Sequence, residues 1–320
     1  MKRFVVILIM SLGFLWTFSL ESQAKEKTVG AFRYEYETLS KNTCCITKVS
    51  VVNKKKTKTM KIPDKLDGKK VVLPKYLKAI NEFTFSELPN LEKMTINSTD
   101  MKGIEVLCFP KWKSFKITKK NKYYKVKDGM LLSKNGKAVY GQLLRTKNIK
   151  IPNGVKTIKE YAFWGYIVDS IYIPKSVNSI EDFAFRTIEK VELKVSKKNK
   201  RYAMSGDCLY SKKSGRLVAA INRNGKLVIP SVVTKLKGGA SSIGGEFKKI
   251  VSPKSVKLLG GGWDAHLLKY GGALYFKSAK IPKVEEGGMS EYTVLYVPKK
   301  ATTKYYYEFA ELNVDVRAWD

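Results

Sequence analysis

The chain has 320 residues, of which 44% are hydrophobic and 28% are charged. This composition supplies enough apolar material for a sizeable core and excludes a disordered polymer. Basic residues outnumber acidic ones by 61 to 28, which gives a formal charge of +33 and makes a polyanionic partner worth testing. The single histidine, His266, excludes a multi-histidine metal site.

Residues 1–24 are predicted to be a signal peptide. Lys2 and Arg3 form a basic start, an almost unbroken apolar run follows from Phe4 to Leu20, and Ser22-Gln23-Ala24 has small residues at the two positions that a signal peptidase reads. The alternative is an uncleaved anchor, although the run is at the short end of the ~20 residues that span a bilayer. We therefore expect a secreted protein, free or associated with the cell surface, with no integral membrane domain after cleavage.

Residues 25–60 are predicted to form an N-terminal capping segment, and residues 61–320 contain internal repeats. Residues 119–124 (KKNKYY) recur as residues 197–202 (KKNKRY), an offset of 78 residues from Asn121 to Asn199. At the same offset Ile151-Pro152 corresponds to Ile229-Pro230, and Ala162 corresponds to Ala240. A register that is shared over this distance indicates a repeat architecture.

A shorter unit of 22 residues lies inside the long one. Residues 151–163 (IPNGVKTIKEYAF) recur as residues 173–185 (IPKSVNSIEDFAF), with the same apolar anchors in the same order. Weaker copies begin at Ile62-Pro63, Ile229-Pro230, Ser252-Pro253, Ile281-Pro282 and Val297-Pro298. The terminal copies have diverged most, as is usual for the capping repeats of an array.

Each unit predicts one short strand and a brief return path. Residues 168–173 alternate apolar and polar side chains, which is typical of a half-buried strand, and Pro174 ends the strand because it has no backbone N–H to donate. The remaining residues are too few for a crossover helix of ordinary length. One coil buries little surface alone, so the units must stack into a solenoid with a parallel sheet along one side.

The sequence at residues 151–163 and 173–185 resembles the leucine-rich-repeat superfamily, and more narrowly the BspA-like, Treponema-type repeats of secreted bacterial surface proteins. The likeness extends more loosely from about Phe32 to the C-terminus. It departs from the family pattern at residues 238–246 and 260–263, where glycine replaces the usual Ala-Phe anchors. The resemblance implies an α/β-type leucine-rich-repeat solenoid with one continuous sheet and mostly turn or short-helix return paths. It also implies a binding protein, such as an adhesin for host matrix or another cell surface, with no catalytic residues to transfer.

Two insertions and a C-terminal cap are predicted within the solenoid. Residues 130–140 contain Asn135-Gly136 between apolar runs, which is a β-hairpin signal, and residues 208–220 repeat the pattern around Gly215. We interpret both hairpins as elaborations of the repeat, with a dedicated binding finger as the alternative. Residues 298–320 form the predicted cap, in which the tyrosines at 305–307 close the last coil or, alternatively, stack on sugars.

Strand alternation predicts which side chains leave the sheet on its outer side. If Ile171 and Ile173 face the core, Ser170 and Tyr172 face outward. The same register predicts a basic row with interleaved tyrosines: Lys93, Lys116, Lys150, Tyr172, Lys190, Lys226, Lys249 and Tyr296. Such a row can bind acidic proteins, sulfated glycans, wall polymers or nucleic acid by charge and stacking. The alternative is that these lysines only keep exposed strands soluble.

The cysteines give no clear chemistry. Four cysteines in an exported chain permit three complete pairings, and adjacent Cys44 and Cys45 are poor partners because the ring that they would close is strained. Cys208 occupies the repeat position of Met130, which predicts a core side chain, and Cys108 also lies in an apolar context. A structural disulfide remains an open alternative. A zinc site is disfavoured because no Cys-x-x-Cys spacing is present.

No pattern in the sequence favours catalysis. His266 lies near Asp264, but no nucleophile is recognisable for which this histidine could act as general base. Gly260-Gly261-Gly262 lacks the Lys-Ser/Thr that follows the glycines of a phosphate-binding loop. We therefore predict no catalytic residues, no cofactor and no metal. The favoured function is protein–protein interaction or adhesion through the sheet face. The alternative is an envelope or extracellular protein that binds polyanions by charge.

Overall fold

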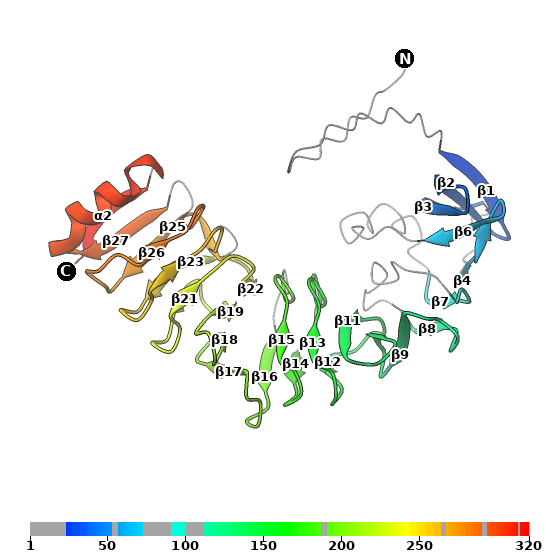
Figure 1. Cartoon of the computed structure of the whole chain (residues 1–320), viewed down its shortest axis with the longest axis horizontal. Helices are drawn as coiled ribbons and strands as arrows, with labels where there is room; N and C mark the ends of the chain where they lie inside the picture. The colour runs from blue at the N-terminus through cyan, green and yellow to red at the C-terminus, as the bar shows by residue number, and fades with distance from the viewer. Residues whose placement is uncertain are drawn as a thin grey trace, which may run out of the picture.

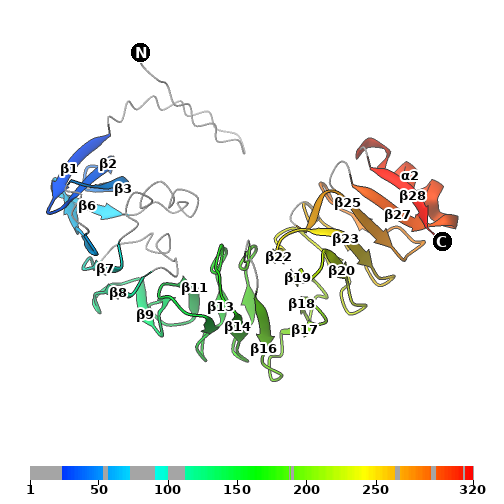
Figure 2. The ribbon, with the colours of Figure 1, turned by 180° about the vertical axis from the view of Figure 1, so that it is seen from behind.

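The computed structural model describes residues 24–52, 57–72, 91–99, 112–186, 188, 191–263, 267–289, 293–312 and 314–319. Apart from Ala24, the predicted signal peptide lies outside the described residues, as do Cys108, Lys190 and His266. The described strands follow an arch whose two ends lie on the same side (Figure 1). Figure 2 shows the same arch from behind.

The main sheet is built from one short parallel strand per coil and has three segments. The N-terminal segment consists of β4 (Thr59–Ile62), β7 (Lys93–Ile96) and β8 (Ser114–Ile117). The central segment consists of β12 (Asn148–Lys150), β14 (Ser170–Ile173) and β16 (Glu192–Val195). The C-terminal segment consists of β20 (Lys226–Val228), β23 (Phe247–Ser252), β25 (Leu268–Phe276), β27 (Val294–Pro298) and β28 (Asp315–Trp319). The prediction of a solenoid of short parallel strands is confirmed.

The sheet is interrupted where the two insertions enter. The first consists of β9 (Tyr124–Lys127), β10 (Met130–Ser133) and β11 (Ala138–Gln142), and the second of β17 (Tyr202–Ser205), β18 (Cys208–Ser211) and β19 (Leu217–Ile221). Both are antiparallel meanders, so the predicted β-hairpins are present. The coil that contains each insertion has 34 residues, from Ile117 to Ile151 and from Val195 to Ile229, instead of 22. This extra chain separates the main strands on either side.

Short return strands form a second set, in which each strand pairs in parallel with the return strand of a neighbouring coil or with a strand of an insertion. They are β13 (Thr157–Ile158), β15 (Ser179–Ile180), β21 (Lys235–Leu236), β24 (Leu258–Leu259) and β26 (Lys283–Val284), with β22 (Ser241–Ile243) paired to β19. In the regular coils Ile-Pro closes a main strand, but Ile281-Pro282 lies directly before the return strand β26, which corrects the repeat start predicted there. The main strand of that coil is β25, which ends at Phe276 without a proline.

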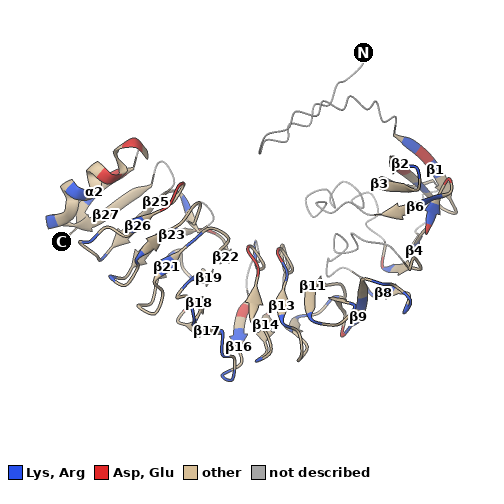
Figure 3. Cartoon of the chain, in the orientation of Figure 1, with Lys and Arg blue, Asp and Glu red and all other residues tan. Residues whose placement is uncertain are grey.

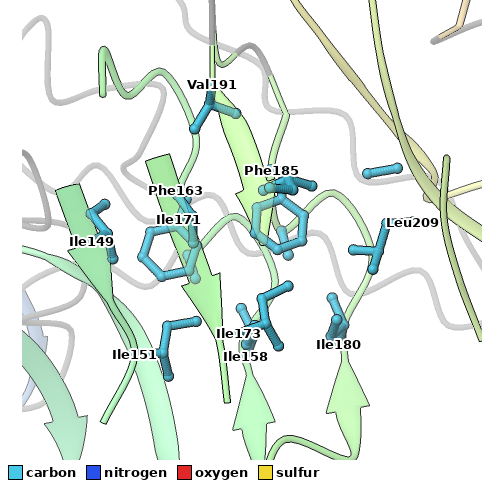
Figure 4. Packing of buried hydrophobic residues seen from close by; sticks show 14 of the residues in the cluster. Ile149, Ile151, Ile158, Phe163, Ile171, Ile173, Ile180, Phe185, Val191 and Leu209 are labelled. Carbon is cyan, nitrogen blue, oxygen red and sulfur yellow. The ribbon is translucent and has the colours of Figure 1, made fainter. Parts of the chain in front are cut away.

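The core lies between the main strands and the return strands. Ile171 and Ile173 of β14 are fully buried, whereas Ser170 and Tyr172 are only half-buried, as the alternation predicts. The rings of Phe163 and Phe185, one coil apart, stack with their centroids 5.8 Å apart. Figure 4 shows these rings among the inward side chains of both strand sets. Burial of each such side chain contributes roughly 1.5–3 kcal/mol to the free energy of folding. Because the burial is achieved against the next coil, every coil is stabilised by its neighbours.

Coils in the glycine-rich region keep the same path. Tyr161 and Phe183 precede the Ala-Phe anchors and have positive φ angles of 54° and 55°, and Gly239 occupies the same repeat position with a φ of 84°. A Cβ at Gly239 would collide with the carboxylate of Asp182, which forms an ion pair with Arg216. Trp263 takes the place of Phe185 in the later coil. Glycine therefore preserves the regular coil at this departure from the family pattern.

The two ends of the solenoid have different structures. At the N-terminus β1 (Lys25–Val29), β2 (Phe32–Ser40), β3 (Thr43–Val51), β5 (Lys65–Leu66) and β6 (Lys69–Val72) form a five-stranded sheet. At the C-terminus η2 (Lys299–Ala301), α2 (Thr302–Phe309) and η3 (Ala310–Leu312) precede β28. Tyr305 of α2 is buried and its hydroxyl donates to the carbonyl of Ser278 at 3.0 Å, whereas Tyr306 and Tyr307 are 57% and 74% exposed. Of these three tyrosines, therefore, only Tyr305 closes the last coil.

Cys44, Cys45 and Cys208 are free, buried thiols. Cys208 is fully buried in the core beside the C-terminal segment, as its repeat position predicts. None of the helices in the described part of the chain has the length and apolar character needed to cross a bilayer.

Candidate binding surface

The outer side of the main sheet carries two rows of side chains, because each strand presents two outward positions. The first outward row contains Thr59, Lys93 and Ser114, then Asn148, Ser170 and Glu192, then Lys226, Lys249, Ala273, Val294 and Asp315. The second outward row contains Lys61, Thr95 and Lys116, then Lys150, Tyr172 and Lys194, then Val228, Val251, Tyr275, Tyr296 and Arg317. Neighbouring strands in a sheet lie about 4.8 Å apart, so side chains of one row within a segment can touch.

The predicted binding residues are divided between these rows. Lys93, Lys226 and Lys249 lie in the first outward row. The second outward row holds the other four described residues, which are Lys116, Lys150, Tyr172 and Tyr296. The register therefore corrects the expectation of a single basic row. The sequence pattern identified these residues as outward, but it did not assign each of them to the first or the second outward row.

Lys190 lies outside the described residues, and the register pairs Tyr172 with Lys194 instead. Lys194 is exposed and forms an ion pair with Glu192 of its own strand at 3.0 Å. In the central segment Tyr172 is thus flanked in its row by Lys150 and Lys194. This part of the outer face is polar and basic.

The C-terminal segment carries a cluster that we call the aromatic platform: Tyr275, Tyr296 and Trp319, with Lys249 and Arg317 at its sides. The rings of Tyr275 and Tyr296, on adjacent strands, stack with their centroids 4.4 Å apart and their planes 5° apart. Trp319 meets Tyr275 edge-on at 6.1 Å, and its indole N–H donates to the carbonyl of Phe276 at 3.2 Å. The structure therefore brings two predicted residues, Lys249 and Tyr296, together with three that the sequence analysis missed.

Two cations complete the aromatic platform. The Lys249 Nζ lies 3.7 Å from the centroid of the Tyr275 ring, a cation–π contact. The guanidinium Nε of Arg317 donates to Asp315 at 2.9 Å. Hydrogen bonds to Asp315 and then to Tyr296 raise the pKa of Arg317. The contacts fix five side chains in one arrangement before any partner arrives.

The tyrosine faces in this cluster are largely used within the protein. Tyr275 has Tyr296 against its ring and the Lys249 ammonium over it, whereas Tyr296 stacks on Tyr275 with one face of its ring. Ring edges and hydroxyls remain for contact with a partner. Around them Val228 is 56% exposed, and Val251 and Val294 are half-buried on the same face. The result is an apolar surface with a positively charged margin.

A signal for the missed residues is present in the sequence. Residues 273–276 (ALYF) alternate outward and inward side chains, which is typical of a main strand. The Ile-Pro pair of this coil, however, lies five residues beyond that strand, at Ile281-Pro282, so the repeat was predicted at the wrong place. In the described part of the chain, no three metal-binding side chains of the His, Cys, Asp or Glu type gather at one point.

Parallel strands that recur once per coil, with inward Ile, Leu, Val and Phe anchors, define a leucine-rich-repeat solenoid. The family model for the BspA type leucine rich repeat region matches six copies, over residues 64–136 and 134–214. Residues 64–214 are therefore a leucine-rich-repeat region of the BspA type. No curated protein matches the chain.

The solved structures that are similar to this chain include the following three. One is a leucine rich cell surface protein from Faecalibacterium prausnitzii, with 14% identity, a TM-score of 0.42, and coverage of 94% of this chain and 96% of that chain. Another is a leucine-rich repeat protein from Eubacterium ventriosum, with 17% identity, a TM-score of 0.38, and coverage of 83% and 77%. The third is the pneumococcal vaccine antigen PcpA, with 12% identity, a TM-score of 0.30, and coverage of 93% and 100%.

Proposed function

We propose that this chain is an exported leucine-rich-repeat protein that adheres to extracellular matrix or surface proteins through the outer face of its main sheet. The solenoid supports this proposal because stacked repeats create extended, rigid binding surfaces. Export is supported by the basic start and apolar run of residues 1–24. N-terminal sequencing of the protein from the culture medium should begin at Lys25, and an intact Met1 would contradict cleavage.

The aromatic platform is the observation that carries the binding proposal. Tyr, Trp and Arg dominate the binding energy of protein interfaces, and here they occur together on an outer face whose other two segments are polar and basic. Because Tyr275, Tyr296 and Lys249 already hold one another, a partner orders few side chains on contact. The margin of Lys226, Lys249 and Arg317 favours a partner surface that presents carboxylates beside apolar groups.

The proposal is tested with residues 25–320 passed over immobilised fibronectin, collagen and laminin. We expect the double variant Tyr275→Ala/Tyr296→Ala to lose at least about 10-fold in affinity for the probe that binds. The matched control is Tyr172→Ala, which removes an outward tyrosine of the same row from the central segment. Circular dichroism establishes that all variants are folded.

The salt dependence of the affinity distinguishes binding by a complementary shape from binding by charge. Binding through the aromatic platform should persist at about 0.5 M salt, where exposed charges are screened within roughly 4 Å. The proposal is contradicted if none of the three matrix proteins binds. It is also contradicted if Tyr172→Ala weakens binding as much as the double variant does.

A further inference from the structure

The 78-residue repeat displays the same lysine-rich turn twice, after β8 and after β16. Lys119, Lys120 and Lys122 are exposed in the first turn. Lys197, Lys198 and Lys200 are exposed at the equivalent positions of the second. No Asp or Glu occurs in residues 112–127 or 193–206. We call residues 119–122 and 197–200 the basic turns.

A buried asparagine holds the first basic turn. The Asn121 amide Nδ2 donates to the carbonyl of Ser98 at 3.0 Å, which attaches the turn to the preceding coil. Its Oδ1 accepts from the backbone N–H groups of Tyr123 at 3.0 Å and Tyr124 at 2.8 Å. Because the side chain is fully buried, these bonds are costly to break, and the turn keeps one shape.

The second basic turn is held in the same way by Asn199. Its Nδ2 donates to the carbonyls of Pro174 at 2.8 Å and Val177 at 3.0 Å, again in the preceding coil. Its Oδ1 accepts from the N–H groups of Arg201 and Tyr202, each at 2.8 Å. The same brace therefore gives both turns one shape, and their lysines are presented in the same arrangement.

Each insertion adds a fourth ammonium group to its basic turn. The Lys134 Nζ donates to the carbonyl of Lys119 at 2.6 Å. The Lys212 Nζ, at the equivalent repeat position, donates to the carbonyl of Asn199 at 2.6 Å. The hairpins thereby bring a distant lysine to each turn. Lys175, which follows β14 in one of the coils between them, is also exposed.

We propose that the basic turns form a second binding site, for a linear phosphate polymer that runs along the outer edge of the arch. Figure 3 shows Lys and Arg recurring in the loops of this edge. The turns follow β8 and β16, which are three strand steps apart, so they are separated by at least roughly 14 Å. A single small anion cannot reach both, whereas an extended polymer can. Lysine binds phosphate as a point charge, without the bidentate geometry that arginine gives to carboxylate.

This site goes beyond the proposed function, because it shares no residue with the aromatic platform. One molecule can then hold an anionic polymer at its middle and a protein partner near its C-terminal end. Two linked contacts raise the overall avidity when both partners lie on one surface.

The test measures binding of residues 25–320 to long-chain inorganic polyphosphate as salt is varied. The turn variant changes six lysines to glutamine: Lys119, Lys120, Lys122, Lys197, Lys198 and Lys200. The matched control makes the same change in net charge at exposed lysines of the C-terminal half: Lys235, Lys248, Lys254, Lys257, Lys277 and Lys283. We expect the turn variant to lose more than about 10-fold in affinity, and its slope of log K against log salt to become shallower by about 0.7 per lost phosphate contact.

Three results would overturn the second site. One is an equal loss in the control variant, which would mean that overall charge alone drives binding. Another is an unchanged affinity in the turn variant. A third is tighter binding to heparin than to polyphosphate at equal charge concentration, which would assign the site to a sulfated glycan. The double variant Tyr275→Ala/Tyr296→Ala should bind polyphosphate as the parent chain does, so this site and the aromatic platform can fail separately.

Discussion

The central and C-terminal segments of the main sheet have equivalent inner faces and contrasting outer faces. Inside, Ile171 and Ile173 of β14 correspond to Leu274 and Phe276 of β25, and all four are fully buried. Outside, the second row reads Lys-Tyr-Lys across the central segment and Val-Val-Tyr-Tyr-Arg across the C-terminal segment. Packing against neighbouring coils favours apolar side chains at the inward positions, with the buried Ser252 of β23 as an exception, whereas the outward positions are free to diverge.

This contrast supports the binding site that we propose on the C-terminal segment. A lysine-rich outer face keeps a parallel sheet soluble without further contacts. The second outward row of the C-terminal segment has fewer charged side chains, and this segment exposes Val228 and the aromatic platform instead. Exposed apolar surface of this kind marks an interaction site more often than a structural requirement. The two segments thus share a fold and differ in the binding chemistry that they offer.

The largest expected effect tests whether the two inner faces are equivalent. Phe185→Ala beside the central segment and Phe276→Ala in the C-terminal segment should each cost about 3–5 kcal/mol, because both remove a fully buried ring and leave a cavity. Urea unfolding followed by circular dichroism measures both losses. A cost below about 1 kcal/mol for one of them would show that its segment is not packed like the other.

The next effect concerns the glycine that keeps the later coils regular. Gly239→Ala should cost about 2–4 kcal/mol, because alanine is strained at a φ of 84° and its Cβ would displace Asp182 from Arg216. The matched control is Gly154→Ala, which has a φ of 97° but open space around the added atom, and should cost about 1–2 kcal/mol. Equal losses in thermal or urea unfolding would exclude the collision as a cause.

A smaller effect sharpens the contrast between the outer faces. In a double-mutant cycle, Tyr275→Ala and Tyr296→Ala should show a coupling of about 0.5–1.5 kcal/mol, because their stacked rings stabilise each other. Tyr172→Ala paired with Tyr296→Ala should show none, since these residues lie in different segments. Free energies of unfolding measure both cycles. Additivity of the Tyr275 and Tyr296 changes would show that the stack contributes nothing to stability.

The smallest effect is a pH dependence in the core next to the C-terminal segment. Burial raises the pKa of the Cys208 thiol to about 12. Above the unfolded pKa of about 8.5, the unfolded chain loses this proton and the folded chain keeps it, so stability is complete below that pH and falls as the pH rises. Relative to Cys208→Ala, the parent chain should lose about 1 kcal/mol of unfolding free energy between pH 8 and about 9.5. A constant difference would contradict this burial.

Much of the fold could be predicted because it depends on local spacing. The 22-residue recurrence of Ile-Pro, Val, Ile and Ala-Phe fixed the coil, and the Asn-Gly pattern at residues 135–136 gave the first hairpin. The last main strands were harder to place, because Phe276 ends β25 without a proline. The candidate site was predicted only in part, because Lys249 and Tyr296 were identified as outward residues. Their neighbours Tyr275 and Trp319 were not identified, since these residues come from other strands and meet the site only through strand pairing.

The sequence by itself determined a stacked solenoid, since a chain with one apolar spine per 22 residues can bury that spine only against copies of itself. Where the repeat was regular, as in residues 168–173, it also determined which side chains face outward, because alternation along a strand is a local property. Only the tertiary structure decided the pairing between strands, which brings Lys249, Tyr275 and Tyr296 into contact. Strand register arises from contacts between distant residues, and a shift of two positions moves a side chain from one outward row to the other.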